Sequence, residues 1–314
     1  MATLRNLLVR YSTFLILLFL VIFFSLVSSR FLTASNILNI LDQSALLGVV
    51  AIGVTYTIIS GGIDLSVGSL VAFVGAVSAG VIVRSGVSVP AGILLGLLVG
   101  TGMGFMNGLF VVYGRLQPFV ATLAMMAIAR GLTLLYTQGR PISGLGDAYT
   151  FFGSSIGPIP VSIIVLTVVV ALSSVLLRRT PFGAYLYAVG GSEETTRLAG
   201  VSVNGVKLGT YAFSGLMVAI GGILLTARLW SAQPQAATGL ELQAIAATVL
   251  GGASLMGGVG TTIGTVAGAL IMGVLANGLN LAGVSSYFQQ VITGSIFILA
   301  VLLDMWTKRR SVPT

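Results

Sequence analysis

The chain of 314 residues contains no cysteine and no histidine. It can therefore form no disulfide, no thiol redox centre and no zinc site built from cysteine and histidine, and it has no imidazole to act as a general base. The seven acidic residues are scattered, and the one adjacent pair is Glu193 and Glu194. These absences argue against an enzyme and predict no metal site in this chain.

Charge is scarce as well, at 7% of residues against ~25% in a typical soluble chain. Hydrophobic residues make up 56%, and the mean hydropathy is +1.08. A helix crosses a bilayer with about 20 mainly apolar residues, and the alternating apolar and polar segments of a membrane β-barrel are missing. The sequence predicts an all-α, polytopic integral membrane protein with a single transmembrane domain over residues 1–314. The ten expected spans are 11–29, 43–60, 66–84, 90–112, 118–137, 161–177, 208–229, 241–257, 261–281 and 286–304.

Two of these spans have special features. The first, 11–29, follows basic residues as a signal peptide does, but its apolar run is too long for one and no small-residue cleavage site follows closely. We therefore expect it to be retained as a span. The segment 241–257 is short and ends in glycines, which is typical of a broken or re-entrant helix.

The net charge of +8 comes largely from basic residues that lie singly at the ends of apolar runs. Residues at these places set membrane topology, because cytoplasmic loops carry an excess of lysine and arginine. With ten spans and a cytoplasmic N-terminus, ten of the 15 basic residues fall on the cytoplasmic side and five on the outer side. We therefore expect both termini in the cytoplasm and no nucleic-acid partner.

A compact charged loop, residues 178–207, interrupts the apolar sequence and holds six of the 22 charged residues. Within it, the stretch from Ser192 to Gly200 has the residues of a capped short helix: a serine at the N-cap, two glutamates in the first turn, an arginine in the last turn and a terminating glycine. Such a helix, anchored by two spans, is suited to docking into a groove on a soluble partner. The alternative is a solvated connection with incidental charges.

The chain contains no G-x-x-x-x-G-K-[ST] phosphate-binding loop. It cannot hydrolyse ATP by that route. If the protein drives transport with ATP, another polypeptide must supply the hydrolysis.

Polar residues within the apolar sequence are candidates for a translocation path. Asp64 and Ser66 lie in the segment GGIDLSVG, residues 61–68, between two spans. A carboxylate there either caps the following helix or lines a path, because ionisable groups at membrane depth are costly and usually functional. The segment 251–258 repeats the spacing G-G-x-x-L-x-x-G, either as an internal repeat or by chance in a chain with 42 glycines.

Further candidates lie elsewhere in the chain. The outer-side segment 230–241 is polar and broken by Pro234, and Gln233 is a suitable hydrogen-bonding group for a neutral polyhydroxylated solute. Asn107, Asn277 and Asn280 lie within spans. Each amide either lines a polar pore or is satisfied by a neighbouring helix, and the 230–241 segment is either part of the path or an ordinary loop.

Several blocks together resemble the permease subunits of bacterial ATP-binding-cassette (ABC) monosaccharide importers, a family with members for ribose, xylose, arabinose and galactosides. Ribose permeases form the most similar branch. The resemblance extends over nearly the whole chain except its first ~30 residues. Its blocks are SGGIDLSVGSLVAF (60–73), FVATLAMMAIARGLTLLYTQGRPI (119–142), YAVGGSEETTRLAGVSVNGVK (187–207), SAQPQAATGLELQAIAATVLGGASLMGGVGTTIGTVAGALIMG (231–273) and NGLNLAGVSSYFQQVITGSIFILAVLLD (277–304).

This resemblance implies a homodimer that encloses one path, a cytoplasmic ABC ATPase, often with two cassettes, and a periplasmic sugar-binding protein. ATP and Mg²⁺ then belong to the ATPase, and this chain holds no cofactor. The resemblance also implies that 190–200 is the coupling helix that seats in the ATPase. One departure is Gln243, where the family is expected to carry aspartate. The expected coupling residues are Gly190, Gly191, Glu193, Glu194, Arg197, Leu198 and Gly200. The expected path or gate residues are Asp64, Ser66, Asn107, Ser231, Gln233, Pro234, Glu241, Gln243, Asn277 and Asn280.

The resulting expectation is a multi-pass permease of the bacterial inner membrane, with ribose as the first candidate solute and xylose, allose, galactose or furanose sugars after it. Two alternatives stay open. One is an ion-coupled secondary sugar transporter, for which Asp64 is almost the only titratable candidate. The other is an ABC permease for a different small polar solute.

Overall fold

The computed structural model describes residues 2–309. Within that range, seven helices are long and apolar enough to cross a membrane. Helices α1 (Ala2–Val27), α11 (Leu240–Leu250) and α13 (Ser286–Arg309) contain shorter apolar stretches. The prediction of a multi-pass helical membrane protein is confirmed. The seven long helices are α2 (Ala34–Ile59), α3 (Val67–Ser85), α4 (Val89–Val112), α5 (Pro118–Thr137), α7 (Val161–Arg179), α10 (Val203–Arg228) and α12 (Thr262–Leu281).

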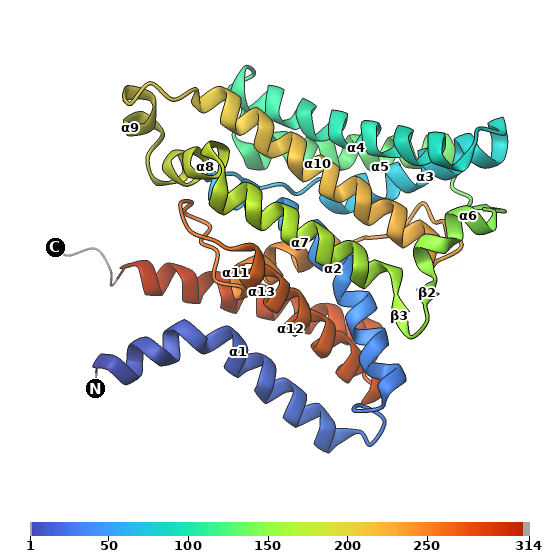
Figure 1. Cartoon of the computed structure of the whole chain (residues 1–314), viewed down its shortest axis with the longest axis horizontal. Helices are drawn as coiled ribbons and strands as arrows, with labels where there is room; N and C mark the ends of the chain where they lie inside the picture. The colour runs from blue at the N-terminus through green and yellow to red at the C-terminus, as the bar shows by residue number, and fades with distance from the viewer. Residues whose placement is uncertain (1, 310–314) are drawn as a thin grey trace.

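The long helices run back and forth between two ends of the molecule (Figure 1). Two short helices, α8 (Pro181–Gly191) and α9 (Glu193–Leu198), lie at one end, called here the α9 end. The opposite end, called the α6 end, carries the short helix α6 (Asp147–Thr150). The start of α1 and the end of α13 both lie at the α9 end (Figure 1). Met1 and residues 310–314 lie outside the described residues.

Short strands at the α6 end are the departures from an all-α fold. β1 (Ile142–Ser143) pairs antiparallel with β4 (Ser231–Ala232), which joins the connection after α5 to the connection after α10. β2 (Ser155–Ile156) and β3 (Ile159–Pro160) form a small hairpin before α7, preceded by the 3-10 helix η1 (Phe151–Gly153). These pieces close the α6 end without forming a layer of their own.

The centre of the bundle is formed by α2 and α10. Nearly every residue of α2 from Ser44 onward is buried, and α10 crosses α4 at very short range. A methyl carbon on Gly104 of α4 would lie 2.7 Å from the Cα of Gly215, and one on Gly100 would lie 2.6 Å from the Cβ of Ala219. Glycine at these positions lets two membrane helices touch backbone to backbone. Gly100 and Gly104 therefore serve the packing of α4 on α10.

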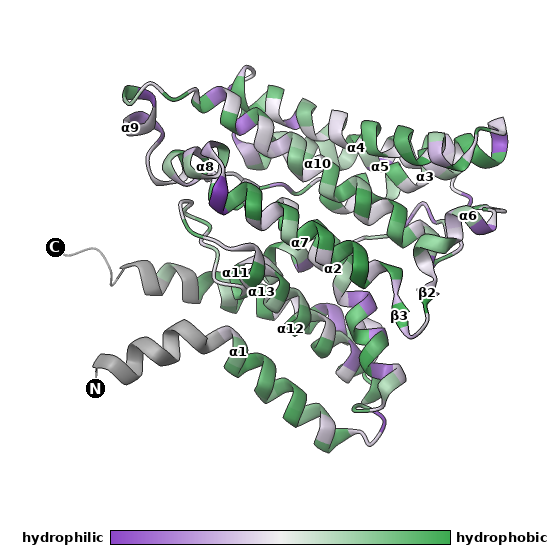
Figure 2. Ribbon diagram, viewed as in Figure 1, coloured by the Kyte–Doolittle hydropathy of each residue, from purple (hydrophilic) through white to green (hydrophobic). Residues whose placement is uncertain are grey.

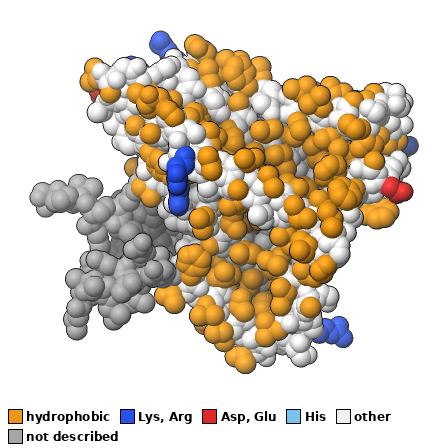
Figure 3. All heavy atoms as spheres, viewed as in Figure 1, with side chains coloured by type: hydrophobic (Ala, Val, Ile, Leu, Met, Phe, Trp, Pro, Cys, Tyr) orange, Lys and Arg blue, Asp and Glu red, His pale blue; other side chains and the backbone are white. Residues whose placement is uncertain are grey.

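Apolar side chains face outward along the helices. Leu135, Leu172 and Leu26 are 77%, 67% and 83% exposed. Hydrophobic side chains are spread over the described surface in view, where few charged side chains appear (Figure 3). The more hydrophilic segments gather toward the ends of the helices, including α9 (Figure 2). This distribution is that of a protein whose solvent along the helices is lipid.

Each expected span contains one helix, but several boundaries were wrong. Helix α2 begins at Ala34 rather than at residue 43, because the polar residues near its start bond to other helices and so can lie inside the helix. Helix α10 begins at Val203 rather than 208. Helix α11 ends at Leu250, and residues 251–261 are non-helical. The expected loop 178–207 contains the helix α8, which the sequence analysis missed.

Candidate functional site

The short helix α9 forms as the sequence predicted. Its N-cap is Ser192, whose Oγ accepts a hydrogen bond from the backbone N–H of Thr195 at 3.2 Å. Gly200 follows the C-cap with φ of +82°, a left-handed conformation that favours glycine. At six residues and ~1.5 Å per residue the helix is only ~9 Å long, so it depends on its attachments to α8 and α10.

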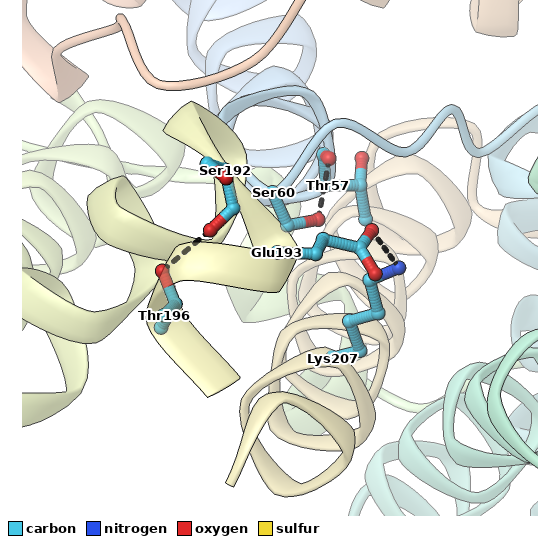
Figure 4. Close-up of polar contacts among 6 residues, drawn as sticks. All are labelled: Thr57, Ser60, Ser192, Glu193, Thr196 and Lys207. Atoms are coloured by element: carbon cyan, nitrogen blue, oxygen red, sulfur yellow. Dashed lines mark hydrogen bonds and ion pairs between the residues drawn. The ribbon is translucent and has the colours of Figure 1, made fainter. Parts of the chain in front are cut away.

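The charged residues of α9 differ in their partners. Glu193 forms an ion pair with Lys207 of α10 (Figure 4). Arg197 forms no ion pair among the described residues, and Leu198 beside it is 83% exposed. Glu194 is also exposed. The helix is thus tied to the bundle by one charge pair and presents an apolar and a cationic side chain outward.

A pocket of about 680 Å³ lies between α9, the start of α10 and the last turn of α4. Arg115, in the turn after α4, holds φ of +51°, an uncommon conformation for a residue with a side chain. Three basic residues, Arg115, Arg197 and Lys207, line the pocket against one acidic residue, Glu193, so the net charge of its lining is positive. The lining residues are Val111, Val112, Tyr113, Arg115, Glu193, Arg197, Val201, Ser202, Val203, Asn204 and Lys207.

The predicted residues Gly190 and Gly191 are the last two residues of α8 and lead directly into α9. Gly190 is half-buried and packs against the backbone at the end of α2, whereas Gly191 is exposed with open space around its Cα. All seven predicted coupling residues therefore lie in one continuous segment at the α9 end. The contact of Gly190 with α2 was not foreseen.

A second group surrounds Asp64 in the extended segment 60–66, between α2 and α3. Asp64 is fully buried. Its Oδ1 accepts the backbone N–H of Ser66 at 3.0 Å and the Ser66 hydroxyl at 2.6 Å, and its Oδ2 accepts the hydroxyl of Ser214 of α10 at 2.9 Å. Asn107 of α4 donates to the Ser66 Oγ at 2.9 Å. Asp64, Ser66 and Asn107 thus form one buried network. It joins the connection between α2 and α3 to α4 and α10.

The hydrogen bonds of this network show how the start of α3 is capped. Ser66 occupies the N-cap position of α3, yet its side chain makes no capping bond. The carboxylate of Asp64 instead accepts the backbone N–H just before the helix. Two buried polar atoms nearby, Asn107 Oδ1 and the Tyr211 hydroxyl, have no hydrogen-bond partner among the described residues. A methyl carbon on Gly62 would lie 2.6 Å from that hydroxyl, so the segment is packed tightly against α10.

A third group lies in the segment after β4. Gln233 donates to Ser231 Oγ at 2.9 Å. The carbonyl oxygens of Pro234 and Ala236 accept hydrogen bonds from Arg130 of α5, at 2.6 and 3.1 Å. Arg130 holds this segment in place, although it was not predicted as a site residue. The signal that could have identified it is an arginine inside an apolar span.

Two predicted residues at the start of α11 adjoin this segment. A methyl carbon on Gly68 of α3 would overlap the Glu241 carboxylate, so Glu241 lies directly against α3. Gln243, one turn into α11, is half-buried. The structure therefore places Glu241 between the break before α3 and the irregular segment after β4.

The remaining two predicted path residues lie on α12, apart from these groups. Asn277 exchanges hydrogen bonds with Asn36 of α2, and Asn280 is exposed. Asn277 is therefore satisfied by a neighbouring helix, one of the two readings left open by the sequence.

Residues 36–301 match the family described as branched-chain amino acid transport system / permease component. The chain belongs to this family. It is 48% identical over 295 residues to the ribose import permease protein of Bacillus subtilis (strain 168), which covers 93% of this chain and 91% of the relative. It is 44% identical over 295 residues to the ribose import permease protein of Escherichia coli (strain K12), covering 92% and 91%.

A more distant relative is the xylose transport system permease protein of Escherichia coli (strain K12), with 34% identity over 343 aligned positions, 90% of this chain and 87% of the relative. No solved structure matches the chain significantly. All three groups of candidate residues fall within the matched range 36–301. The chain is thus a membrane transport component of the permease type.

Proposed function

We propose that this chain is the transmembrane permease subunit of an ABC importer for ribose or a closely similar pentose or hexose. The observation that carries the proposal is the 48% identity to a ribose import permease over more than nine-tenths of both chains. The xylose permease matches at 34%, so pentose import extends to the more distant relative as well. The family description names branched-chain amino acids, but these relatives with nearly full coverage are named for sugars.

The proposed assembly contains a second copy of this chain, a cytoplasmic ABC ATPase and a periplasmic sugar-binding protein. ATP and Mg²⁺ bind to the ATPase, because the permease sequence has no phosphate-binding loop. The permease then contributes the path, and its energy comes from the partner. The chain does no catalysis of its own in this scheme.

The proposed topology has ten passes through the bacterial inner membrane, with the α9 end in the cytoplasm. Its support is that the start of α1, the end of α13 and α9 lie at one end of the molecule (Figure 1). The same end holds the turn with Arg115 and the pair Arg178 and Arg179 at the end of α7. An excess of basic residues at one end is the signature of a cytoplasmic face.

In the proposed mechanism, α9 is the coupling helix. Its exposed Leu198 and unpaired Arg197, with Glu193 and Glu194, meet a groove on the ATPase. Gly190 and Gly191 join α9 to α8, and Gly200 ends the turn after it. ATP binding and hydrolysis move α9, and the bundle alternates between outward and inward access. The buried network of Asp64, Ser66 and Asn107 holds one break beside the path, and Arg130 holds the segment with Ser231, Gln233 and Pro234 at the outer side. Glu241, Gln243 and Asn280 complete the proposed path or gate, whereas Asn277 pairs with Asn36 between α2 and α12.

Transport by the reconstituted complex tests this function. The permease is reconstituted into proteoliposomes with the ATPase and the binding protein encoded beside its gene, and uptake of radiolabelled ribose, xylose and leucine is compared. We expect uptake of ribose or xylose that requires ATP and all three components. Leucine uptake would contradict the sugar assignment, and uptake by the permease alone under an ion gradient would support a secondary transporter instead.

A further inference from the structure

At Gly190, the end of α8 touches the end of α2 and the non-helical segment between α11 and α12. A methyl carbon on Gly190 would overlap the carbonyl oxygen of Ile59, the last residue of α2, and would lie 2.5 Å from the backbone nitrogen of Gly258. Gly258 belongs to the non-helical segment 251–261 between α11 and α12. Only a residue without a side chain fits at this position.

The two backbone groups that Gly190 covers, the Ile59 carbonyl and the Gly258 N–H, are joined by a hydrogen bond. The backbone N–H of Gly258 donates to the carbonyl oxygen of Ile59 at 2.9 Å. A carbonyl at the end of a helix has no partner within that helix. Here the segment between α11 and α12 supplies the donor. This bond joins the breaks after α2 and after α11, which carry the same spacing of glycines, at 61–68 and 251–258.

The contact is made of backbone on both sides. Gly257 and Gly258 have φ of +86° and +71°, and a methyl carbon on Gly257 would lie 2.6 Å from the Gly190 carbonyl oxygen. Backbone cannot move aside as the tip of a flexible side chain can, so a displacement of α8 is passed on to both segments. Close-packed atoms are hardly compressible and transmit strain to their neighbours.

A second bond holds α8 to the same segment. Tyr187, three residues before Gly190, donates its hydroxyl to the carbonyl oxygen of Gly260 at 2.6 Å. Burial raises the pKa of the Tyr187 hydroxyl, and the nearby Arg178 partly opposes this rise. The hydroxyl therefore stays protonated and can donate the bond. The neighbouring Tyr185 is 43% exposed and makes no side-chain hydrogen bond among the described residues.

We infer that Gly190 is a positioning residue that links the coupling helix α9 to the non-helical segments 60–66 and 251–261, so that a movement of α9 shifts both segments together. The inference rests on the proposed function. It adds a place and a means for the coupling: a backbone joint formed by Gly190, Ile59 and Gly258. Gly190 touches neither solute nor nucleotide, and its effect passes through the two breaks.

The chain offers a matched control one residue away. Gly191 lies in the same helix, also precedes α9, and has nothing within 4 Å of an added methyl carbon. The test compares Gly190→Ala with Gly191→Ala in the complete complex of permease, ATPase and binding protein. The readouts are assembly of the complex, basal ATP hydrolysis, stimulation of hydrolysis by the sugar-loaded binding protein, and ATP-dependent sugar uptake.

We expect Gly190→Ala to assemble and to keep its basal hydrolysis, while stimulation and uptake fall about tenfold, within the ~5- to 150-fold range of typical coupling between sites. Gly191→Ala should match the wild type in all four readouts. A merely structural role would lower assembly and basal hydrolysis together with uptake. Wild-type uptake by Gly190→Ala, or equal losses in both variants, would overturn the joint.

If Gly190→Ala fails to assemble, the tyrosine pair decides. Tyr187→Phe removes only the hydroxyl bonded to Gly260, and Tyr185→Phe is its control in the same helix. Loss of stimulation in Tyr187→Phe alone, with normal assembly, supports the joint, and equal behaviour of the two overturns it. Failure of the wild-type complex to import sugar with ATP would instead reject the proposed function, so the two failures are distinguishable.

Discussion

Asn36 and Asn277 exchange two hydrogen bonds across the contact of α2 and α12: Asn36 Nδ2 to Asn277 Oδ1 at 3.0 Å, and Asn277 Nδ2 to Asn36 Oδ1 at 2.8 Å. Each side-chain amide uses its partner's donor and acceptor. In a membrane protein such a pair joins two helices that lipid does not press together. The pair also explains why α2 continues through a polar stretch near its start.

We predict that Asn36→Leu and Asn277→Leu each destabilise the protein by roughly 1–3 kcal/mol, because each leaves the other amide without its partner on the facing helix. The loss should be smaller for Asn277→Leu, since Asn36 Nδ2 keeps its hydrogen bond to the Phe31 carbonyl oxygen. The double variant should lose less than the sum of the single losses, since no amide is then left unpaired. Thermal unfolding of the detergent-purified protein measures all four forms. Strictly additive losses would contradict the reciprocal pairing.

Variants of Asp64 distinguish two roles of its carboxylate: a hydrogen-bond acceptor that stabilises the fold, and a negative charge that transport requires. In Asp64→Asn the remaining oxygen can still accept from Ser66, and the Ser214 hydroxyl can turn to accept from the new amide group. We expect this variant to fold and to retain most of its uptake. Asp64→Leu removes both acceptor atoms and should lower the melting temperature strongly.

The measurements for Asp64 are melting temperature and ATP-dependent uptake in the same preparation. Normal stability with abolished uptake in Asp64→Asn would show that transport requires the negative charge itself, and would contradict a role as acceptor. Ser214→Ala serves as the matched control, because it removes one of the three bonds and leaves the carboxylate in place.

At the α6 end, Arg228 of α10 reaches two residues of α2. Its Nε lies 3.1 Å from Asp42 Oδ2, and its Nη2 donates to Asn39 Oδ1 at 3.1 Å. We expect Arg228→Lys to lose much of the stabilising effect, because an ammonium group cannot span both partners as the guanidinium does. The loss should be about 1 kcal/mol for this partly exposed pair. Thermal unfolding measures this loss of stability, with Arg140→Lys at an exposed position as the control. An equal loss in the two variants would contradict the prediction.

The ion pair between Glu193 and Lys207 allows charge swaps on α9. Glu193→Lys alone should loosen α9, because it places two cations side by side. Adding Lys207→Glu restores an attractive pair, so α9 should regain its order. If the ATPase recognises the charge at 193, binding stays weak in the double variant. Co-purification of the ATPase at rising salt concentration measures this, and full recovery of binding would assign Glu193 a purely internal role.

Arg197 gives the complementary prediction. It forms no ion pair among the described residues, so Arg197→Glu should leave the stability of the permease unchanged. Binding of the ATPase should weaken and become less sensitive to salt, since a cationic contact is lost. Unchanged ATPase binding would remove Arg197 from the docking surface.

The short helix α9 was predictable residue by residue, because capping is local: Ser192 bonds to Thr195 three residues away, and Gly200 ends the turn. The extra helix α8 was not. Its residues Pro181–Gly191 read as part of a charged loop, and its burial depends on contacts with the ends of α2 and α10 that no local pattern reports.

The candidate site divides in the same way. The sequence pointed to Asp64 as an ionisable group between spans, yet its partner Ser214 is 150 residues distant. It also pointed to the paired glycine spacings at 61–68 and 251–258, but not to the bond from Gly258 to Ile59 that joins the two breaks. Arg130 went unassigned because its acceptors, the carbonyls of Pro234 and Ala236, are backbone atoms of a distant segment.

The multi-pass helical membrane class and the cap of α9 are determined by the sequence alone, because hydropathy and capping act over a few residues. The tertiary structure alone decided which breaks meet, which amides pair and where Gly190 lies. These depend on how helices pack, and in lipid close packing and polar bonds between distant residues select the neighbours.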